Sequence, residues 1–172
     1  DPAKTRVLNR MRLRRNADVP VQPLRLDGDE LNLARVLVNG QGASFRMEGE
    51  QLVLDNLPDD FELEVFTTCQ PAKNTKLMGL FVSEDTFFTQ CEAEGFRRIT
   101  YFLDRPDVMA SYTVLIRASK ADYPVLLSNG NLVEQGELPE GRHFAKWVDP
   151  FKKPSYLFAL VAGKLVAREQ RI

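Results

Sequence analysis

The stretch TRVLNRMRLRR, residues Thr5–Arg15, alternates between two kinds of side chain. Thr5, Val7, Met11 and Leu13 take the odd-numbered positions, and arginine takes the even-numbered positions 6, 10, 12 and 14. Successive side chains of a β-strand point to opposite faces, so this period of two predicts a half-buried strand. Its arginines favour a solvated outer face that also hinders edge-to-edge pairing. A nucleic-acid-binding stripe is the alternative interpretation of the same arginines.

Short segments of the same type recur along the rest of the chain, separated by turn residues. Strands are predicted at 24–26, 33–38, 44–47, 51–54, 61–68, 77–82, 112–118, 125–128, 132–135, 143–148, 156–162 and 164–167. Asn39-Gly40 and Asn129-Gly130 each follow one of them, and Asn-Gly supplies the positive φ angles of a tight hairpin turn. This pattern predicts an all-β protein, an antiparallel β-sandwich of two packed sheets.

Residues 84–105 depart from the strand pattern. Phe96, Ile99 and Leu103 are spaced three or four residues apart, which is typical of one face of a helix. Pro106 disfavours the helical conformation for Arg105 and would end such a helix. We therefore predict one short helical or irregular insertion around 84–105.

Composition and charge exclude several classes of partner. With 172 residues, 44% hydrophobic and 27% charged, the chain is long and apolar enough to fold as one domain. A formal net charge of −1 provides no general attraction to nucleic acid or to an anionic membrane. No apolar run is long enough to span a bilayer. We therefore expect neither nucleic acid nor membrane as a partner.

The chain contains one histidine, His143, and two cysteines, Cys69 and Cys91. They are scattered without the spacing of zinc ligands, so no zinc site is predicted in this chain. His143 lies in an alternating segment and is interpreted as a structural residue of a strand. The two cysteines are expected to be free thiols in a reducing compartment, which predicts a cytoplasmic protein.

Residues 90–94, QCEAE, contain two carboxylates and an amide within five positions. Gln90, Glu92 and Glu94 could form a small acceptor cluster for an ammonium group. If the segment is extended, the three side chains share one face, and if it is helical they do not. Acid pairs of this kind are more commonly solvated surface groups.

A longer run around this motif resembles a known family. Residues 89–107, TQCEAEGFRRITYFLDRPD, are closely similar to the N-terminal domain of the aminopeptidase N family, gluzincin zinc aminopeptidases, particularly the bacterial members. Further matching runs lie at 126–131, 141–143 and 149–163, with weaker matches at 24–28 and 56–58. The resemblance covers nearly the whole chain, in order.

The resemblance implies that residues 1–172 are a single N-terminal β-sandwich domain. The family's zinc ligands lie in H-E-x-x-H and a downstream glutamate, and its G-A-M-E-N motif binds the substrate's amino end. None of these occurs in this chain. We therefore expect it to start after the family's lead-in strand, to end before the thermolysin-like catalytic domain, and to be inactive alone. Zinc would belong to the full-length enzyme, and the partners would be the peptide's amino terminus and the catalytic domain of the same polypeptide.

The family's Q-C-E run matches Gln90, Cys91 and Glu92. By this resemblance, Glu92 binds the free α-ammonium of the peptide and Gln90 lines the pocket for its first side chain. A carboxylate at the closed end of a cleft favours a charged amino terminus through a charge-assisted hydrogen bond. In the whole enzyme, zinc would polarise the scissile carbonyl and activate water while the glutamate of H-E-x-x-H acts as general base. Glu92 would orient the substrate without transferring protons. The residues expected to support the loop that presents it are Glu94, Arg97, Asp104 and Arg105.

Two other functional classes compete with this interpretation. Related domains occur in a transcription-complex subunit without peptidase activity, so a non-catalytic interaction β-sandwich is the main alternative. A carbohydrate-binding sandwich has Trp147 and scattered tyrosines in its favour. The carboxylate of Glu92 at the anchor position favours the aminopeptidase domain, because an interaction module has no need of it.

Overall fold

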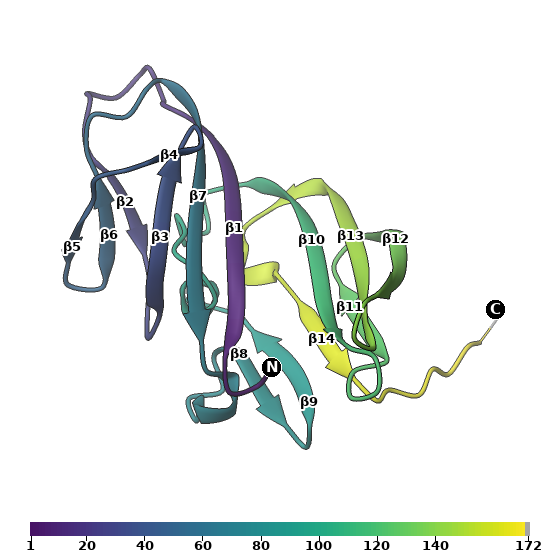
Figure 1. Cartoon of the computed structure of the whole chain (residues 1–172). Coiled ribbons are helices and arrows are strands. Elements are labelled where there is room, and N and C mark those ends of the chain that lie inside the picture. The colour runs from purple at the N-terminus through teal and green to yellow at the C-terminus, as the bar shows by residue number, and fades with distance from the viewer. Residues whose placement is uncertain (171–172) are drawn as a thin grey trace.

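The structure is a computed structural model that describes residues 1–170, and it consists mainly of antiparallel strands (Figure 1). Sheet A has the strand order β1 (Thr5–Arg14), β7 (Asp60–Cys69), β3 (Asn32–Val38) and β4 (Gln41–Gly42). Sheet B has the order β2 (Leu24–Asp27), β6 (Gln51–Leu54) and β5 (Arg46–Glu48). Sheet C has the order β11 (Val125–Ser128), β14 (Leu160–Gly163), β9 (Thr86–Gln90) and β8 (Gly79–Ser83). Sheet D has the order β10 (Ala110–Ser119), β13 (Arg142–Lys153) and β12 (Asn131–Leu138).

The predicted all-β antiparallel sandwich is confirmed, and its hydrogen bonds divide the strands into four sheets. Helical structure among residues 1–170 is confined to short 3₁₀ turns, η1 (Pro71–Lys73), η2 (Phe96–Arg98) and η3 (Ser155–Leu157). One core joins all four sheets, with members such as Val65 in sheet A, Leu52 in sheet B, Phe87 in sheet C and Ala145 in sheet D. The sheets therefore stabilise one another through shared apolar burial.

Strand β1 shows the alternation that the sequence predicts. It pairs with β7 along its whole length, so that Met11 lies opposite Leu63 and Arg10 opposite Glu64. On the outer face, Arg10 Nη2 is 2.9 Å from Glu64 Oε1, and Arg12 and Arg14 both contact a single acid of β7, Asp60. The arginines are thus paired across strands, which fits the solvated face better than a nucleic-acid-binding stripe.

Only one of the two predicted Asn-Gly hairpins forms. Asn39 and Gly40 have φ of 50° and 76° and connect the paired strands β3 and β4, as predicted. Asn129-Gly130 makes no hairpin, because β11 pairs with β14 while β12 pairs with β13. A Cβ atom at Gly130 would lie 2.2 Å from the oxygen of Val148, so this glycine permits close contact with β13 as the chain passes between sheets.

The insertion around 84–105 is shorter than predicted. Its first part, Thr86–Gln90, forms β9, and the irregular part begins at Cys91. The helix predicted from Phe96, Ile99 and Leu103 is the single 3₁₀ turn η2, with Phe96 and Ile99 buried. The apolar spacing therefore predicted which side chains are buried but overstated the length of the helix.

Several strand boundaries also need correction. The strand predicted at 44–47 lies at Arg46–Glu48, and the apolar run at 77–82 forms β8 from Gly79. The strand predicted at 156–162 begins only at Leu160, because residues 155–157 form η3. Residues 164–167 form no strand, and Val166 is almost fully exposed, so its side chain gains nothing from a sheet.

His143 and Trp147 tie sheet D to the start of sheet C. His143 Nε2 lies 2.7 Å from the carbonyl oxygen of Tyr123, and the Trp147 indole donates a hydrogen bond of 3.0 Å to the carbonyl of Leu126. His143 therefore has the structural role that the sequence predicts. Trp147 is engaged in the fold, which argues against the carbohydrate-binding interpretation.

Strands β1 and β10 are edge strands that run beside each other (Figure 1). Residues of both line a groove of about 730 Å³, with Phe96, Phe102 and Phe158 among its other lining residues. The same phenylalanines and Tyr112 form an aromatic cluster with ring centroids 5.0–6.3 Å apart, edge to face around Phe96 and tilted where Tyr112 meets Phe102 and Phe158. Through Phe96 and Phe102, the irregular segment thus contributes to the aromatic cluster.

Candidate functional site

The candidate site is the turn Cys91–Gly95, which follows directly after β9. The Gly95 amide donates a hydrogen bond of 2.8 Å to the Cys91 carbonyl and closes the turn, and the Glu92–Ala93 peptide bond is cis. Cys91 is buried, whereas Glu92 and Glu94 are exposed. The turn therefore anchors one side chain in the core and presents both carboxylates to solvent.

Gln90 and Glu92 lie next to each other, but Glu94 is engaged elsewhere. The Gln90 Nε2 amide donates a hydrogen bond of 3.1 Å to the main-chain carbonyl of Glu92. Glu94 Oε2 lies 3.6 Å from Nη1 of Arg97, which follows it by three residues. The segment is neither extended nor helical, so the cluster of three acceptors predicted for an extended chain does not form as such. The roles predicted for Glu92 and Gln90 stay predictions.

Gly95 allows the turn to pack directly on backbone. A Cβ atom at this position would lie 2.2 Å from the carbonyl oxygen of Gln90 and 2.9 Å from the amide nitrogen of Gly79 in β8. Such distances are far below van der Waals contact, so a larger residue would have to displace the main chain. Glycine at this position holds the turn against the edge of sheet C.

Arg97, two residues after the turn, forms an ion pair with Asp104. Asp104 Oδ2 accepts hydrogen bonds from the Arg97 side chain, at 2.9 Å from Nε, and from the Arg97 main-chain amide, at 3.1 Å. Arg97 Nη2 also donates to the Asp104 main-chain carbonyl at 3.0 Å. The hydroxyl of Ser155 donates to Asp104 Oδ1. With three hydrogen bonds to its oxygens, the buried carboxylate is well satisfied.

Arg98 forms a second set of contacts, with the segment between β2 and β3 and with the residue before β8. Its guanidinium contacts the carboxylates of Asp29 and Glu30, and its Nε donates to the Met78 carbonyl at 3.2 Å. In addition, the Asp29 amide donates to the Arg97 carbonyl at 3.0 Å. The acidic turn between β2 and β3 thus wraps around the two adjacent arginines. None of these contacts was predicted, because they join residues far apart in the sequence: Arg98 is about twenty positions from Met78 and nearly seventy from Asp29 and Glu30.

The Cys91 thiol lies beneath the turn in apolar surroundings. Burial, with a smaller contribution from the nearby Asp104 carboxylate, raises the pKa of the Cys91 thiol to about 12. Burial likewise raises the pKa of Cys69 to about 11. Both cysteines are free thiols, as predicted. Their raised pKa values make them poor nucleophiles, so they pack as small apolar groups.

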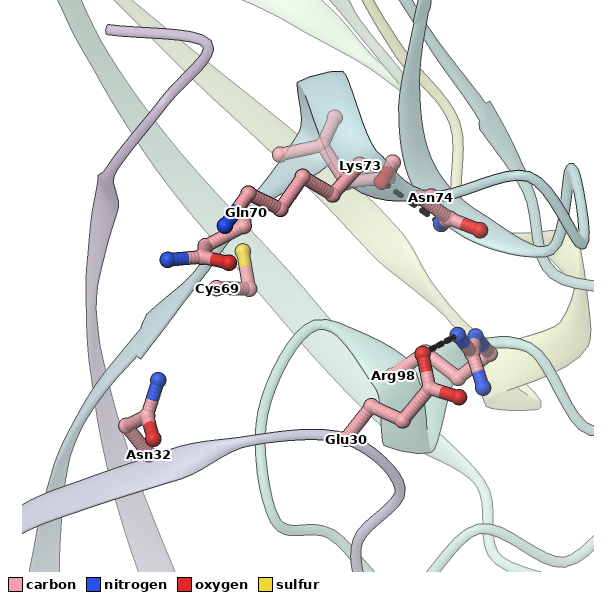
Figure 2. A pocket seen from close by; sticks show the side chains of 8 residues that line it. Glu30, Asn32, Cys69, Gln70, Lys73, Asn74 and Arg98 are labelled. Atoms are coloured by element: carbon pink, nitrogen blue, oxygen red, sulfur yellow. Dashed lines mark hydrogen bonds and ion pairs between the residues drawn. The ribbon is translucent and has the colours of Figure 1, made fainter.

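A small polar cavity of about 130 Å³ lies beside this network (Figure 2). Figure 2 shows Glu30 pointing toward Arg98 on one side, with Gln70 and Lys73 across the cavity. Asn74 donates hydrogen bonds of 2.7 and 2.9 Å to the carbonyls of Met78 and Leu80, which fixes one wall. Among the lining side chains Glu30 and Arg98 pair with each other, whereas Asn74 Oδ1 is buried without a hydrogen-bond partner among residues 1–170. The sequence did not indicate this cavity.

The fit of a metal can be tested on the residues that the structure describes. Across residues 1–170, no group of three or more His, Cys, Asp or Glu side chains is placed to hold a metal ion. Glu94 is instead paired with Arg97, and Asp29 is paired with Arg98. The zinc that the family resemblance implies therefore does not fit this part of the chain. In the same range, no helix is long and apolar enough to cross a membrane.

Comparison with known proteins identifies relatives of the whole fold. The family model of the peptidase M1 N-terminal domain matches residues 21–157. Aminopeptidase N of Escherichia coli (strain K12) is 56% identical over 142 residues, which cover 82% of this chain and 16% of that protein. Aminopeptidase N of Caulobacter vibrioides is 48% identical over 167 residues, which cover 95% of this chain and 19% of that protein.

A solved structure agrees with these relatives. The crystal structure of Legionella pneumophila aminopeptidase A in complex with aspartic acid superposes with a TM-score of 0.88 and 38% identity, covering 94% of this chain and 20% of that chain. This chain spans a fifth or less of the length of each of these relatives. Because the family model matches well over half of its residues, the chain belongs to the peptidase M1 N-terminal domain family.

Proposed function

We propose that this chain is the substrate-anchoring domain of a zinc aminopeptidase that removes amino-terminal residues from peptides, and that Glu92 binds the substrate's α-ammonium. The observation that carries the proposal is an exposed carboxylate on a turn closed by a main-chain hydrogen bond of 2.8 Å, in a domain of the M1 family. Identity of 56% with an aminopeptidase N supports the aminopeptidase assignment.

The chemistry of the turn suits an amino terminus. A carboxylate accepts charge-assisted hydrogen bonds from an ammonium group, and these are about twice as strong as neutral ones. An internal peptide nitrogen carries no such charge, so Glu92 favours the binding of substrates with a free amino terminus. The Gln90 amide nitrogen is engaged with the Glu92 carbonyl, which leaves its oxygen to line the pocket for the first side chain. Glu92 orients the substrate and transfers no proton.

The remaining machinery is assigned to other parts of the parent protein. We infer that the zinc ligands and the general base lie in a catalytic domain of the same polypeptide, and that residues 1–172 form its N-terminal β-sandwich domain. Supporting this, the chain spans 16% of the E. coli relative. It follows that this chain alone should release no chromophore from an alanine anilide in the presence of added zinc. Two buried free thiols support a reducing, cytoplasmic location.

Substitution of Glu92 in the full-length parent tests the proposal. Glu92→Gln keeps the shape and removes the charge, so we expect kcat/KM to fall by roughly ten- to hundredfold, with a larger loss for Glu92→Ala. Zinc content should stay the same, because Glu92 is not a ligand. Glu94→Gln is the matched control: its carboxylate faces Arg97 at 3.6 Å and should matter much less. Equal losses for Glu92→Gln and Glu94→Gln would contradict the assignment.

A further inference from the structure

We propose that Arg97 is a positioning residue for substrate binding: clamped by Asp104, it holds the Cys91–Gly95 turn so that Glu92 meets the substrate's ammonium. This inference rests on the proposed function of Glu92. From the sequence, we expect Glu94, Arg97, Asp104 and Arg105 to support this loop. In the structure Arg97 and Asp104 hold each other, whereas Arg105 pairs with Asp107. The geometry therefore points to Arg97 and to the mechanism by which it would act.

The guanidinium of Arg97 is held at several points. Nε and Nη2 donate to Asp104 at 2.9 and 3.0 Å, and Nη2 is also 4.0 Å from the Asp27 carboxylate. Nη1 also faces Glu94 at 3.6 Å, but the Glu94 side chain is 70% exposed, so this contact contributes little. The planar fork of an arginine can satisfy partners in several directions at once, which a lysine ammonium on a flexible stem does less well. Arg97 therefore connects η2, which directly follows the turn, to two other segments of the chain.

Asp104 fixes both the side chain and the backbone of Arg97. Its side chain is 1% exposed, so water cannot solvate the carboxylate, and Arg97 and Ser155 have to satisfy it. The Arg97 main-chain amide donates to the same carboxylate at 3.1 Å, which fixes the backbone of η2 as well as the side chain. A buried charge with fixed partners gives a defined geometry, because moving any partner leaves the charge unsatisfied.

The backbone connects this clamp to Glu92. The Cys91 carbonyl accepts a hydrogen bond from the Gly95 amide, and the Gly95 carbonyl accepts one of 3.0 Å from the Arg98 amide. Glu92 and Arg97 thus belong to one continuous hydrogen-bonded segment that begins at the buried Cys91. A shift of Arg97 would move Gly95 and with it the carbonyl end of the turn. Displacement of a binding group by about 1 Å is enough to weaken catalysis strongly.

A double-mutant cycle in the full-length parent separates positioning from general stability. Arg97→Lys keeps the charge and loses the fork, so we expect kcat/KM to fall roughly tenfold, chiefly through KM. In the Glu92→Gln background, the same Arg97→Lys change should cost less than about twofold, because the group that it positions is already disabled. The matched control is Arg105→Lys: Arg105 is exposed and pairs with Asp107 alone in the described residues 1–170, so it should change nothing in either background.

The outcomes distinguish the inference from the function on which it rests. Equal losses for Arg97→Lys in both backgrounds would show a merely structural role and overturn the inference, with the function of Glu92 intact. If Glu92→Gln alone leaves kcat/KM unchanged, the proposed function fails first and the inference fails with it. Ser155→Ala, which removes the hydroxyl that donates to Asp104 Oδ1, gives the same test should Arg97→Lys fold poorly. It should show the same non-additivity with Glu92→Gln.

Discussion

Pairs of arginine and carboxylate side chains occur both between strands β1 and β7 and in the irregular segment 91–105, but the two sets differ in their exposure to solvent. On the outer face of sheet A, Arg10, whose side chain is 59% exposed, pairs with acids across the strand. In the irregular segment, Arg97 pairs with an Asp104 side chain that is 1% exposed. Exposed pairs contribute little because water competes for both charges, whereas a buried charge depends on its partner.

The contrast shows what holds each region in place. The strands are fixed by ladder hydrogen bonds and by apolar burial, so their surface charges are replaceable. Residues 91–95 have no ladder to follow, and close backbone packing and buried charges determine the shape of the segment instead. A turn built in this way can present Glu92 rigidly although it belongs to no strand.

Removing the buried partner should give the largest effect on stability. Arg97→Gln leaves the Asp104 carboxylate buried without its counter-charge, so we expect the free energy of unfolding of the chain to fall by about 3 kcal/mol. Equilibrium unfolding in urea measures this value. A loss as small as that of an exposed pair would show that Asp104 is satisfied without Arg97, and the contrast between the two regions would disappear.

Close backbone packing should give the next largest effect. In Gly95→Ala the added Cβ would approach the Gln90 carbonyl oxygen to 2.2 Å, and the forced displacement should cost about 2 kcal/mol. Gly42→Ala is the matched control, because a Cβ atom there meets no atom within 4 Å. The difference between the two variants in urea unfolding measures the packing under the turn. Similar stabilities for both variants would mean that the turn can relax freely.

The buried thiol of Cys91 predicts a smaller effect that depends on pH. Its pKa is raised from an ordinary value of 9.0 to about 12, so the folded state favours the protonated thiol. The corresponding stability is fully present below pH 9 and is lost as pH rises through 9 toward 12. Between pH 8 and pH 10, the wild-type chain should lose roughly 1 kcal/mol more than Cys91→Ala. Parallel losses in both proteins would indicate that the thiol is accessible to solvent.

The exposed pairs of sheet A should give the smallest effect. Arg10→Gln removes contacts with Glu62 and Glu64 on a solvated face, so we expect the stability to change by less than about 1 kcal/mol. Adding salt to the wild-type chain should screen the same pairs and produce a similar small change. If Arg10→Gln proved as costly as Arg97→Gln, exposure would not be what separates the two regions.

The sequence predicts the strands well because their signal is local. The alternation in β1 and β7 repeats every second residue, so a single strand reveals which side faces the core. Asn39-Gly40 is similar, since the two residues that need positive φ are themselves the turn. Asn129-Gly130 has the same sequence but packs against β13 and the segment before β14 instead of closing a hairpin. The Asn129 side chain donates a hydrogen bond to the carbonyl of Leu157 and accepts one from the amide of Ala159. A local pattern cannot distinguish these two uses.

The sequence predicts which residues form the candidate site but not how the fold arranges them. The sequence indicated Gln90 and Glu92 through a family resemblance, and it showed two carboxylates close together. It could not show that Glu94 turns toward Arg97, or that Arg98 contacts Asp29 almost seventy residues earlier. The Glu94–Arg97 contact is local but needs the 3₁₀ turn η2, and the Arg98–Asp29 contact needs tertiary packing of the segment after β2 against η2. Single-sequence patterns carry no signal for such packing.

The most direct test of the account asks whether Glu92 recognises the charge of the amino terminus. In the full-length parent, kcat/KM is measured for an alanine anilide and for its α-hydroxy analogue, which has a hydroxyl in place of the ammonium. We predict that Glu92→Gln reduces the preference for the amine roughly ten- to hundredfold, while Glu94→Gln leaves the preference almost unchanged. A preference that stays within about twofold of the wild-type value in Glu92→Gln would contradict the account, because the carboxylate would then not be the group that detects the ammonium.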